Sequence, residues 1–160
     1  MSGEEEQELL GEYLATCARL ETGFSETCTY VARILPISAD LIDTLPVSEE
    51  TFILSFIKRF EQFEDALHRT LKVISKIMEH GKIERLTSVD VTRRARALGI
   101  IADERVWADA VRARNALAHE YPLNPQKRAD QVNDAWEKRD TLTSTWSAIR
   151  RFVDEEGLLA

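Results

Sequence analysis

Apolar residues recur every three or four positions along nearly all of this 160-residue chain, and this spacing constrains the fold more than any other feature. Such spacing places apolar side chains on one face of an α-helix, whereas a half-buried strand alternates apolar and polar residues. No run of the sequence shows convincing alternation. The sequence therefore predicts an all-α fold, an antiparallel bundle of about five helices joined by short connections.

Capping residues, prolines and glycines divide the pattern into five expected helices. Ser48, Asp103 and Asn124 are expected to cap the second, fourth and fifth helices, because their side-chain oxygens accept hydrogen bonds from first-turn amides. Pro36 is expected to end the first helix, and Gly99 the third. The expected helices cover residues 4–34, 48–79, 88–99, 103–121 and 124–155, within one domain over residues 1–160.

The expected core is rich in aromatic residues. Phe52, Phe56, Phe60 and Phe63 follow one another at helical spacing, a pattern more typical of a core than of a binding platform. In the fourth helix the expected inward positions are Val106, Trp107, Ala110, Val111, Ala113, Leu117 and Ala118.

The net charge of −7 argues against a generic nucleic-acid binder, and no DNA binding is expected. The charge is unevenly distributed, however. Residues 1–65 carry 4 basic and 14 acidic side chains, whereas residues 66–160 carry 17 basic and 14 acidic ones. Arg93, Arg94 and Arg96 form the densest basic cluster, and with Arg112 they are weak candidates for contacts with RNA. A solvated helix face without a ligand is the alternative.

The cysteines and histidines indicate neither a disulfide nor a metal site. Cys17 and Cys28 would lie about 16 Å apart along one helix, so reduced thiols in a cytoplasmic protein are expected. His68, His80 and His119 lack the spacing of metal ligands, and neither a metal nor a cofactor is expected. No apolar run is long enough to span a membrane, and the acidic start does not resemble a signal peptide.

The stretch "RNALAHEY" at residues 114–121 carries the densest chemistry in the sequence. Arg114 and His119 point about 140° apart on an ideal helix, so they do not share a face. They converge only if the helix loosens near His119 or if two copies of the chain contribute. Loosening is plausible because Pro122 disfavours helical geometry at the preceding residue.

Together, arginine and histidine suit the cleavage of RNA without a metal. A guanidinium stabilises the charge that builds on phosphorus, and an imidazole, which titrates near pH 6.5, handles protons at the 2′-hydroxyl or the leaving oxygen. Asn115 is expected to hold the phosphate or the imidazole. The plain alternative is a surface ion pair at Arg114, with His119 closing the helix and Tyr121 packed against the protein.

"RNALAHEYP" closely resembles the signature of HEPN domains and is most similar to HepT-type toxins, whose motif is R-x-x-x-x-H-x-Y with a polar residue after the arginine. Arg114, Asn115, His119 and Tyr121 match this motif without a departure. The resemblance includes "TFILSFIKRFEQFEDAL" at residues 51–67 and the turn "YPLNP", and it is strongest over residues 45–153.

This resemblance implies a helical homodimer that joins two copies of the motif in one cleft. It implies a metal-independent ribonuclease toxin in which Arg114 and His119 are catalytic. It further implies that a cognate minimal nucleotidyltransferase, the antitoxin, neutralises the toxin by adenylylating Tyr121. Two alternatives stay open: a non-catalytic module that binds nucleotide or a nucleotidyltransferase, and a purely structural dimeric bundle.

Overall fold

A computed structural model of the chain describes residues 3–79, 85–119 and 122–159. These residues form seven helices and no strand, so the predicted all-α fold is confirmed, with two more helices than expected. The helices are α1 (Gly3–Val31), α2 (Ala39–Ile42), α3 (Val47–Met78), α4 (Ser88–Ala97), α5 (Glu104–Ala118), α6 (Pro125–Glu137) and α7 (Arg139–Glu156).

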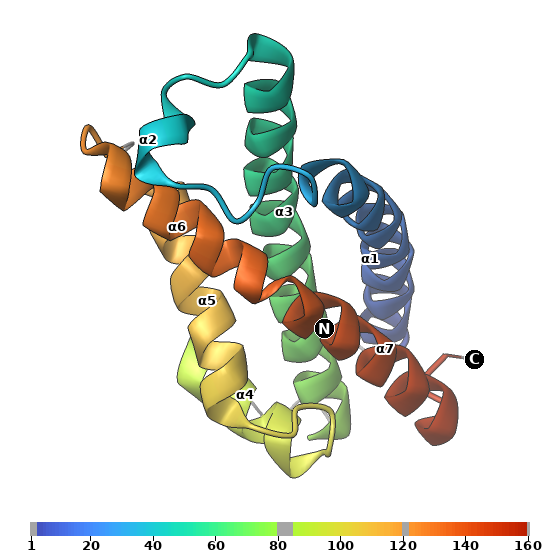
Figure 1. Ribbon diagram of the computed structural model, residues 1–160. Helices are drawn as coiled ribbons and strands as arrows, with labels where there is room; N and C mark the ends of the chain where they lie inside the picture. Colours follow the sequence, from blue (N-terminus) through green and yellow to red (C-terminus); the bar gives the residue numbers. More distant parts are fainter. Residues whose placement is uncertain (1–2, 80–84, 120–121, 160) are drawn as a thin grey trace.

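Helix α3 is the centre of the bundle, and every other helix except α2 packs against it. Helix α1 lies antiparallel beside it, while α5 packs on another side and runs back along α3 from the short helix α4 (Figure 1). Helices α6 and α7 then cross the bundle diagonally in near continuation of each other (Figure 1). This arrangement places the end of α5 beside the first half of α3.

An aromatic cluster joins three of these helices in the core. Phe24 of α1 lies 5.9 Å from Phe56 and 5.5 Å from Phe63 of α3, measured between ring centroids. Trp136 of α6 meets Phe56 edge-on at 5.8 Å. Phe60 is also fully buried, so the expectation of an aromatic core is confirmed for three of the four phenylalanines.

The core prediction is wrong for three positions. Phe52 is 39% exposed and stacks on Tyr30 at 5.2 Å, because it lies at the start of α3 where fewer helices cover it. Val106 is 47% exposed. The buried residues of α5 begin at Trp107 and recur every three positions, and Val106 does not lie on that face of the helix. Ala118 is exposed at the last residue of α5.

Two predicted caps are confirmed and one is wrong. Asp103 accepts a hydrogen bond from the backbone N–H of Arg105 at 2.8 Å, and Asn124 accepts one from that of Gln126 at 2.8 Å. Ser48, in contrast, lies inside the first turn of α3, which begins after Pro46 without a side-chain cap. Pro46 disfavours helical geometry at the residue before it, so α3 does not begin earlier in the chain.

Two other helix ends differ from the expectation, and a third agrees with it. Helix α1 ends at Val31, three residues early, and the chain passes through a turn to the cis Leu35–Pro36 bond. Helix α4 is capped by Thr87, which exchanges hydrogen bonds with Asp90 in a capping box. Gly99 has φ of 79°, a left-handed conformation that suits glycine and ends this region as predicted.

The expected last helix is two helices, because it breaks at Lys138. No proline or glycine marks the break, and the apolar spacing runs through it, so the sequence carries no signal for it. The side chain of Arg139 compensates locally: its Nη1 donates to the carbonyl of Trp136 at 2.7 Å, and its guanidinium lies 3.7 Å from the Trp136 ring centroid.

Two polar contacts fasten the segment around α2 to α6. Asn133 accepts from the backbone N–H of Ile37 at 2.8 Å and donates to its carbonyl at 2.7 Å. Arg128 forms an ion pair with Asp43. The segment therefore forms a fixed wall beside the first turns of α3.

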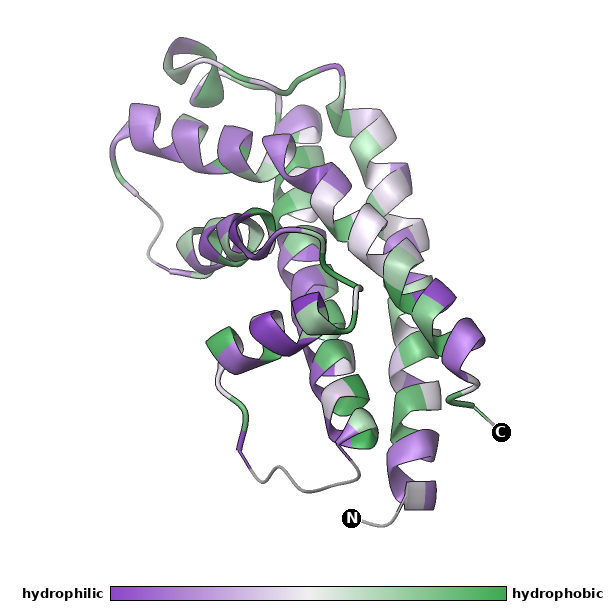
Figure 2. Ribbon diagram, turned by 90° about the horizontal axis from the view of Figure 1, so that it is seen from below, coloured by the Kyte–Doolittle hydropathy of each residue, from purple (hydrophilic) through white to green (hydrophobic). Residues whose placement is uncertain are grey.

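None of the described helices is both long and apolar enough to cross a membrane. Figure 2 shows that the long helices carry hydrophilic as well as hydrophobic residues around their circumference. Cys17 and Cys28 are both free, as expected.

Candidate functional site

Arg114 lies in the second half of α5 and points to α3, where two consecutive carboxylates face it. Its Nε is 3.4 Å from Oε2 of Glu64, and its Nη2 is 3.8 Å from Oδ1 of Asp65. The arginine side chain keeps 32% of its surface exposed. Its guanidinium is thus paired with both carboxylates, while part of the side chain stays in contact with solvent.

Glu64 is the buried member of this pair. The residue is 4% exposed, and burial raises the pKa of its carboxyl to about 7, partly offset by the charge of Arg114 and reinforced by that of Asp65. A carboxyl in such a place changes its charge near neutral pH. The net charge beside Arg114 therefore depends on pH in the physiological range.

Further polar groups surround the arginine. Arg69 pairs with Asp65 at 2.9 Å and is hydrogen-bonded to Tyr13 of α1. His68 is half-buried, and burial lowers its pKa, although the nearby charge of Asp65 acts in the opposite direction. Arg114 thus belongs to a network that joins α1, α3 and α5.

His119 follows the last residue of α5 and has left the helix. Its backbone is extended, with φ of −85° and ψ of −168°, as expected from loosening before Pro122. The side chain is exposed and lines a cavity of about 330 Å³ with residues of α2, α3 and α6. In a single chain, His119 therefore faces a different part of the surface from Arg114.

Arg114 and the cavity beside His119 meet α3 at different positions. Arg114 meets α3 at Glu64, whereas the cavity beside His119 is lined on α3 by residues up to Ile57. Seven helical residues span about 10 Å. Within one copy, Arg114 and His119 therefore lie beside different parts of α3.

The remaining predicted site residues have varied surroundings. Asn115 is exposed and accepts a hydrogen bond from Nη1 of Arg114 at 3.2 Å, so it contacts the arginine. Arg94 pairs with Glu79 at 2.6 Å, and Arg112 pairs with Asp109. Arg93 and Arg96 are exposed on α4. Tyr121, the predicted modification site, and His80 lie outside the described residues.

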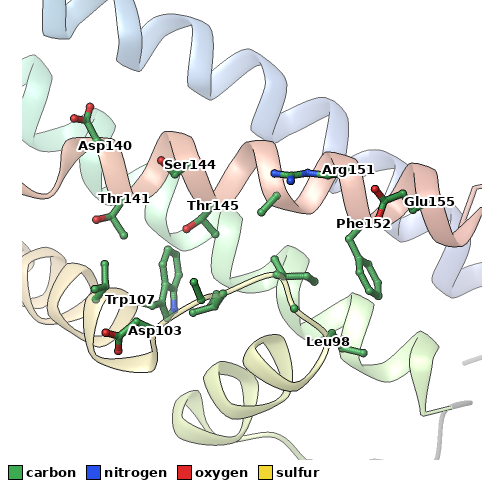
Figure 3. Close-up of a pocket in the computed structure, with 16 residues that line it drawn as sticks. Leu98, Asp103, Trp107, Asp140, Thr141, Ser144, Thr145, Arg151, Phe152 and Glu155 are labelled. Atoms are coloured by element: carbon green, nitrogen blue, oxygen red, sulfur yellow. The ribbon is translucent and has the colours of Figure 1, made fainter.

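A larger cavity, of about 680 Å³, lies between α7 and the connection from α4 to α5. Figure 3 shows Trp107 and Asp103 on one side of it, with Thr141, Thr145 and Arg151 of α7 on the other. None of the residues predicted for catalysis lines it. The chemistry suggested by the sequence therefore does not coincide with this larger cavity.

Sequence reasoning missed Glu64 and His68. A signal for Glu64 is present: its carboxyl interrupts an apolar stripe, four positions after Phe60 and three before Leu67, on the buried face of α3. Charged residues are rarely fully buried without a partner, so such a position indicates one. The sequence did not show that Asp65 contacts the motif. In the structure it lies beside Arg114.

Comparison with known proteins gives one family. Residues 12–139 match the family described as "nucleotidyltransferase substrate binding protein like". The match covers α5 and the Arg114 network and ends at the start of α7. Searches of curated proteins and of solved structures gave no match. The chain therefore belongs to the nucleotidyltransferase substrate binding protein-like family, which includes HEPN-fold proteins related to HepT.

Proposed function

We propose that this protein is a metal-independent ribonuclease toxin whose active site is completed by two copies of the chain. The observation that carries the proposal is the placement of the motif: Arg114 of α5 faces two carboxylates of α3 and stays partly exposed, and His119 leaves the helix five residues later. Family membership and the full R-x-x-x-x-H-x-Y match support it.

The chemistry follows from these two side chains. His119 of one copy takes the proton of a 2′-hydroxyl, the O2′–P bond forms, and the P–O5′ bond breaks as the leaving oxygen takes a proton from solvent water. Arg114, whose side chain is partly exposed, stabilises the charge on the phosphoryl oxygens. The products are a 2′,3′-cyclic phosphate and a 5′-hydroxyl end. Because the two side chains diverge within one chain, a two-fold axis supplies the partner group.

RNA cleavage in EDTA tests the proposal. The wild type should cut RNA and leave 2′,3′-cyclic phosphate ends, while Arg114→Ala and His119→Ala should each lose at least 100-fold in rate, as expected for loss of charge stabilisation or proton transfer. Arg105→Ala, an exposed arginine at the other end of α5, is the matched control and should retain activity. Undiminished cleavage by both site variants would refute the assignment.

We further propose that a cognate nucleotidyltransferase silences the toxin by adenylylating Tyr121. The family description, which names nucleotidyltransferase substrates, supports this partner class. An attached AMP adds negative charge and bulk two residues from His119, where an RNA phosphate would bind. With the antitoxin and ATP, the wild type should gain the mass of AMP and Tyr121→Phe should not; equal labelling of both proteins would reject the site.

A second candidate is a non-catalytic module that binds nucleotide or a nucleotidyltransferase. The compensation of Arg114 by two carboxylates favours it, because a paired guanidinium attracts phosphate less strongly. This candidate predicts a nucleotide-dependent complex with the transferase and no cleavage of RNA by unmodified protein.

A further inference from the structure

The cavity beside His119 has the size and lining of a small ligand site. Its volume of about 330 Å³ lies at the lower end of the range for ligand pockets, about 300–1,000 Å³. An α-helix with side chains, about 10–12 Å wide, does not fit such a space. We infer that it holds one nucleobase of the RNA strand, next to the phosphate at which His119 acts. This inference rests on the proposed ribonuclease function and deepens it.

The floor of the cavity suits the flat face of a base. Ile53 and Val132 are buried there, and Ile57 lies beside them. Leu54, which is 52% exposed, lines the same cavity and offers apolar surface that solvent reaches. Bases of single-stranded RNA bind proteins by leaving the stack and placing their faces on apolar or aromatic side chains.

The wall of the cavity is fixed before any ligand arrives. Nη1 of Arg128 donates to the carbonyl of Pro122 at 2.7 Å and to that of Leu123 at 2.8 Å, and the same side chain pairs with Asp43 of the α2 segment. Arg128 thereby ties α6 to the turn after His119 and to α2. A preformed pocket loses little conformational freedom on binding.

Polar groups at the cavity provide a means of selecting the base. Glu50 is exposed and Gln131 is half-exposed, and both line the cavity. An ionised carboxylate only accepts hydrogen bonds, so Glu50 favours a base that carries an amino group. Adenine, cytosine and guanine have one, whereas the only base donor of uracil is its ring N3–H, which lies between two carbonyl oxygens that a carboxylate repels. The pocket should therefore disfavour uracil at one position next to the cut.

Three variants test this base site by two separate measurements. Leu54→Trp fills the cavity, Glu50→Gln keeps its shape but adds a donor, and Val106→Trp is the matched control, an exposed apolar residue that lines the larger cavity instead. Binding is measured by anisotropy with a 2′-O-methyl RNA tetranucleotide, which cannot be cut. Base preference is measured by sequencing the ends that each variant leaves in a random RNA pool.

Leu54→Trp should weaken binding of the tetranucleotide at least 10-fold and abolish the preference against uracil. Glu50→Gln should cut RNA and accept uracil at that position, because its amide donates to a uracil carbonyl. Val106→Trp should match the wild type in both measurements. A Glu50→Gln variant with the wild-type base preference would overturn the inference even if Leu54→Trp failed to fold.

Other outcomes separate this inference from the proposed function. A wild type that cuts RNA, with Leu54→Trp indistinguishable from it, retains the ribonuclease and removes the base site. A wild type that binds the tetranucleotide through Leu54 but never cuts RNA removes the ribonuclease and keeps the base site. Loss of the dimer in Leu54→Trp, seen by size-exclusion chromatography with light scattering, would show that the cavity is covered by a second copy and would overturn the inference.

Discussion

At the scale of single residues, Arg114 is held between two carboxylates of different character. Asp65 is 41% exposed in its side chain and shares its charge with Arg69, while Glu64 is buried and titrates with a pKa of about 7. Above that pH both carboxylates oppose the positive charge of Arg114. Below it only Asp65 does, so the arginine becomes more available to a phosphate as the pH falls through neutrality.

The raised pKa of Glu64 predicts a pH-dependent stability. An unfolded glutamate titrates near 4.3, so the folded protein retains this proton to higher pH, and the free energy of unfolding falls as the pH rises from about 4.3 to about 7. The loss amounts to roughly 4 kcal/mol at most. Glu64→Gln should remove it, leaving stability near pH 5 little changed and raising it near pH 8.

Urea unfolding of the wild type and Glu64→Gln near pH 5 and pH 8 measures this effect. Glu26→Gln, an exposed glutamate on α1, is the control and should behave like the wild type. If the wild type and Glu64→Gln lost stability in parallel between the two pH values, Glu64 would not be the titrating group.

Residue types in a motif were readable from the sequence, whereas their contacts were not. Arg114, Asn115 and His119 were identified from their residue types, their spacing and their resemblance to a family motif. The pairing of Arg114 with Glu64 was not, because it depends on how α5 packs against α3, fifty residues earlier in the chain. Such long-range contacts are set by the complementary faces of two helices, which a local pattern does not specify.

At the scale of helices, the end of α5 is the decisive feature. The helix stops at Ala118, and His119 turns out of it ahead of Pro122, which provides no backbone N–H and disfavours helical geometry before it. Arg114 stays on the regular part of α5, where the α3 carboxylates anchor it. Helix α5 thus holds Arg114 in place, whereas His119 lies just outside the helix.

Pro122→Ala should extend α5 and return His119 to the helical track. NMR chemical shifts of His119 should become helical, and RNA cleavage should fall at least 10-fold, because misplacement of a catalytic group by about 1 Å is enough for a large loss. Pro125→Ala, at the first position of α6, is the control and should retain activity. Helical shifts at His119 with full activity would show that its displacement is not needed.

Asn133 makes two of the polar contacts that attach the α2 segment to α6. Asn133→Ala leaves the N–H and the carbonyl of Ile37 without their hydrogen bonds, and should lower the free energy of unfolding by about 1–3 kcal/mol. Chemical denaturation measures the loss. Asp130→Ala, exposed on the same helix, should change stability by less than about 0.5 kcal/mol, and an equal effect of both would exclude the proposed role of Asn133.

The sequence predicted which segments are helical, but it predicted the ends of the helices less well. The caps at Asp103 and Asn124 were correct because each residue makes its own local hydrogen bonds. The short helix α2 was missed because it depends on contacts with a distant helix, such as the hydrogen bonds between Asn133 and Ile37. The break at Lys138 was missed because no proline or glycine marks it.

At the scale of the whole molecule, one copy of the chain carries half of the proposed site. Arg114 and His119 lie at different levels beside α3, and the base site proposed here adjoins His119. In the proposed dimer, a second copy related by a two-fold axis would supply the missing partner to each half. The central claim is therefore that Arg114 of one subunit works with His119 of the other.

A heterodimer of two inactive variants tests this claim most directly. One subunit carries Arg114→Ala and the other His119→Ala, and two different affinity tags isolate the mixed species from both homodimers. In a shared site, the intact His119 of the first subunit meets the intact Arg114 of the second, so the heterodimer should cut RNA in EDTA at about half the wild-type rate. A heterodimer as inactive as the two homodimers, beside an active wild type, would contradict the account.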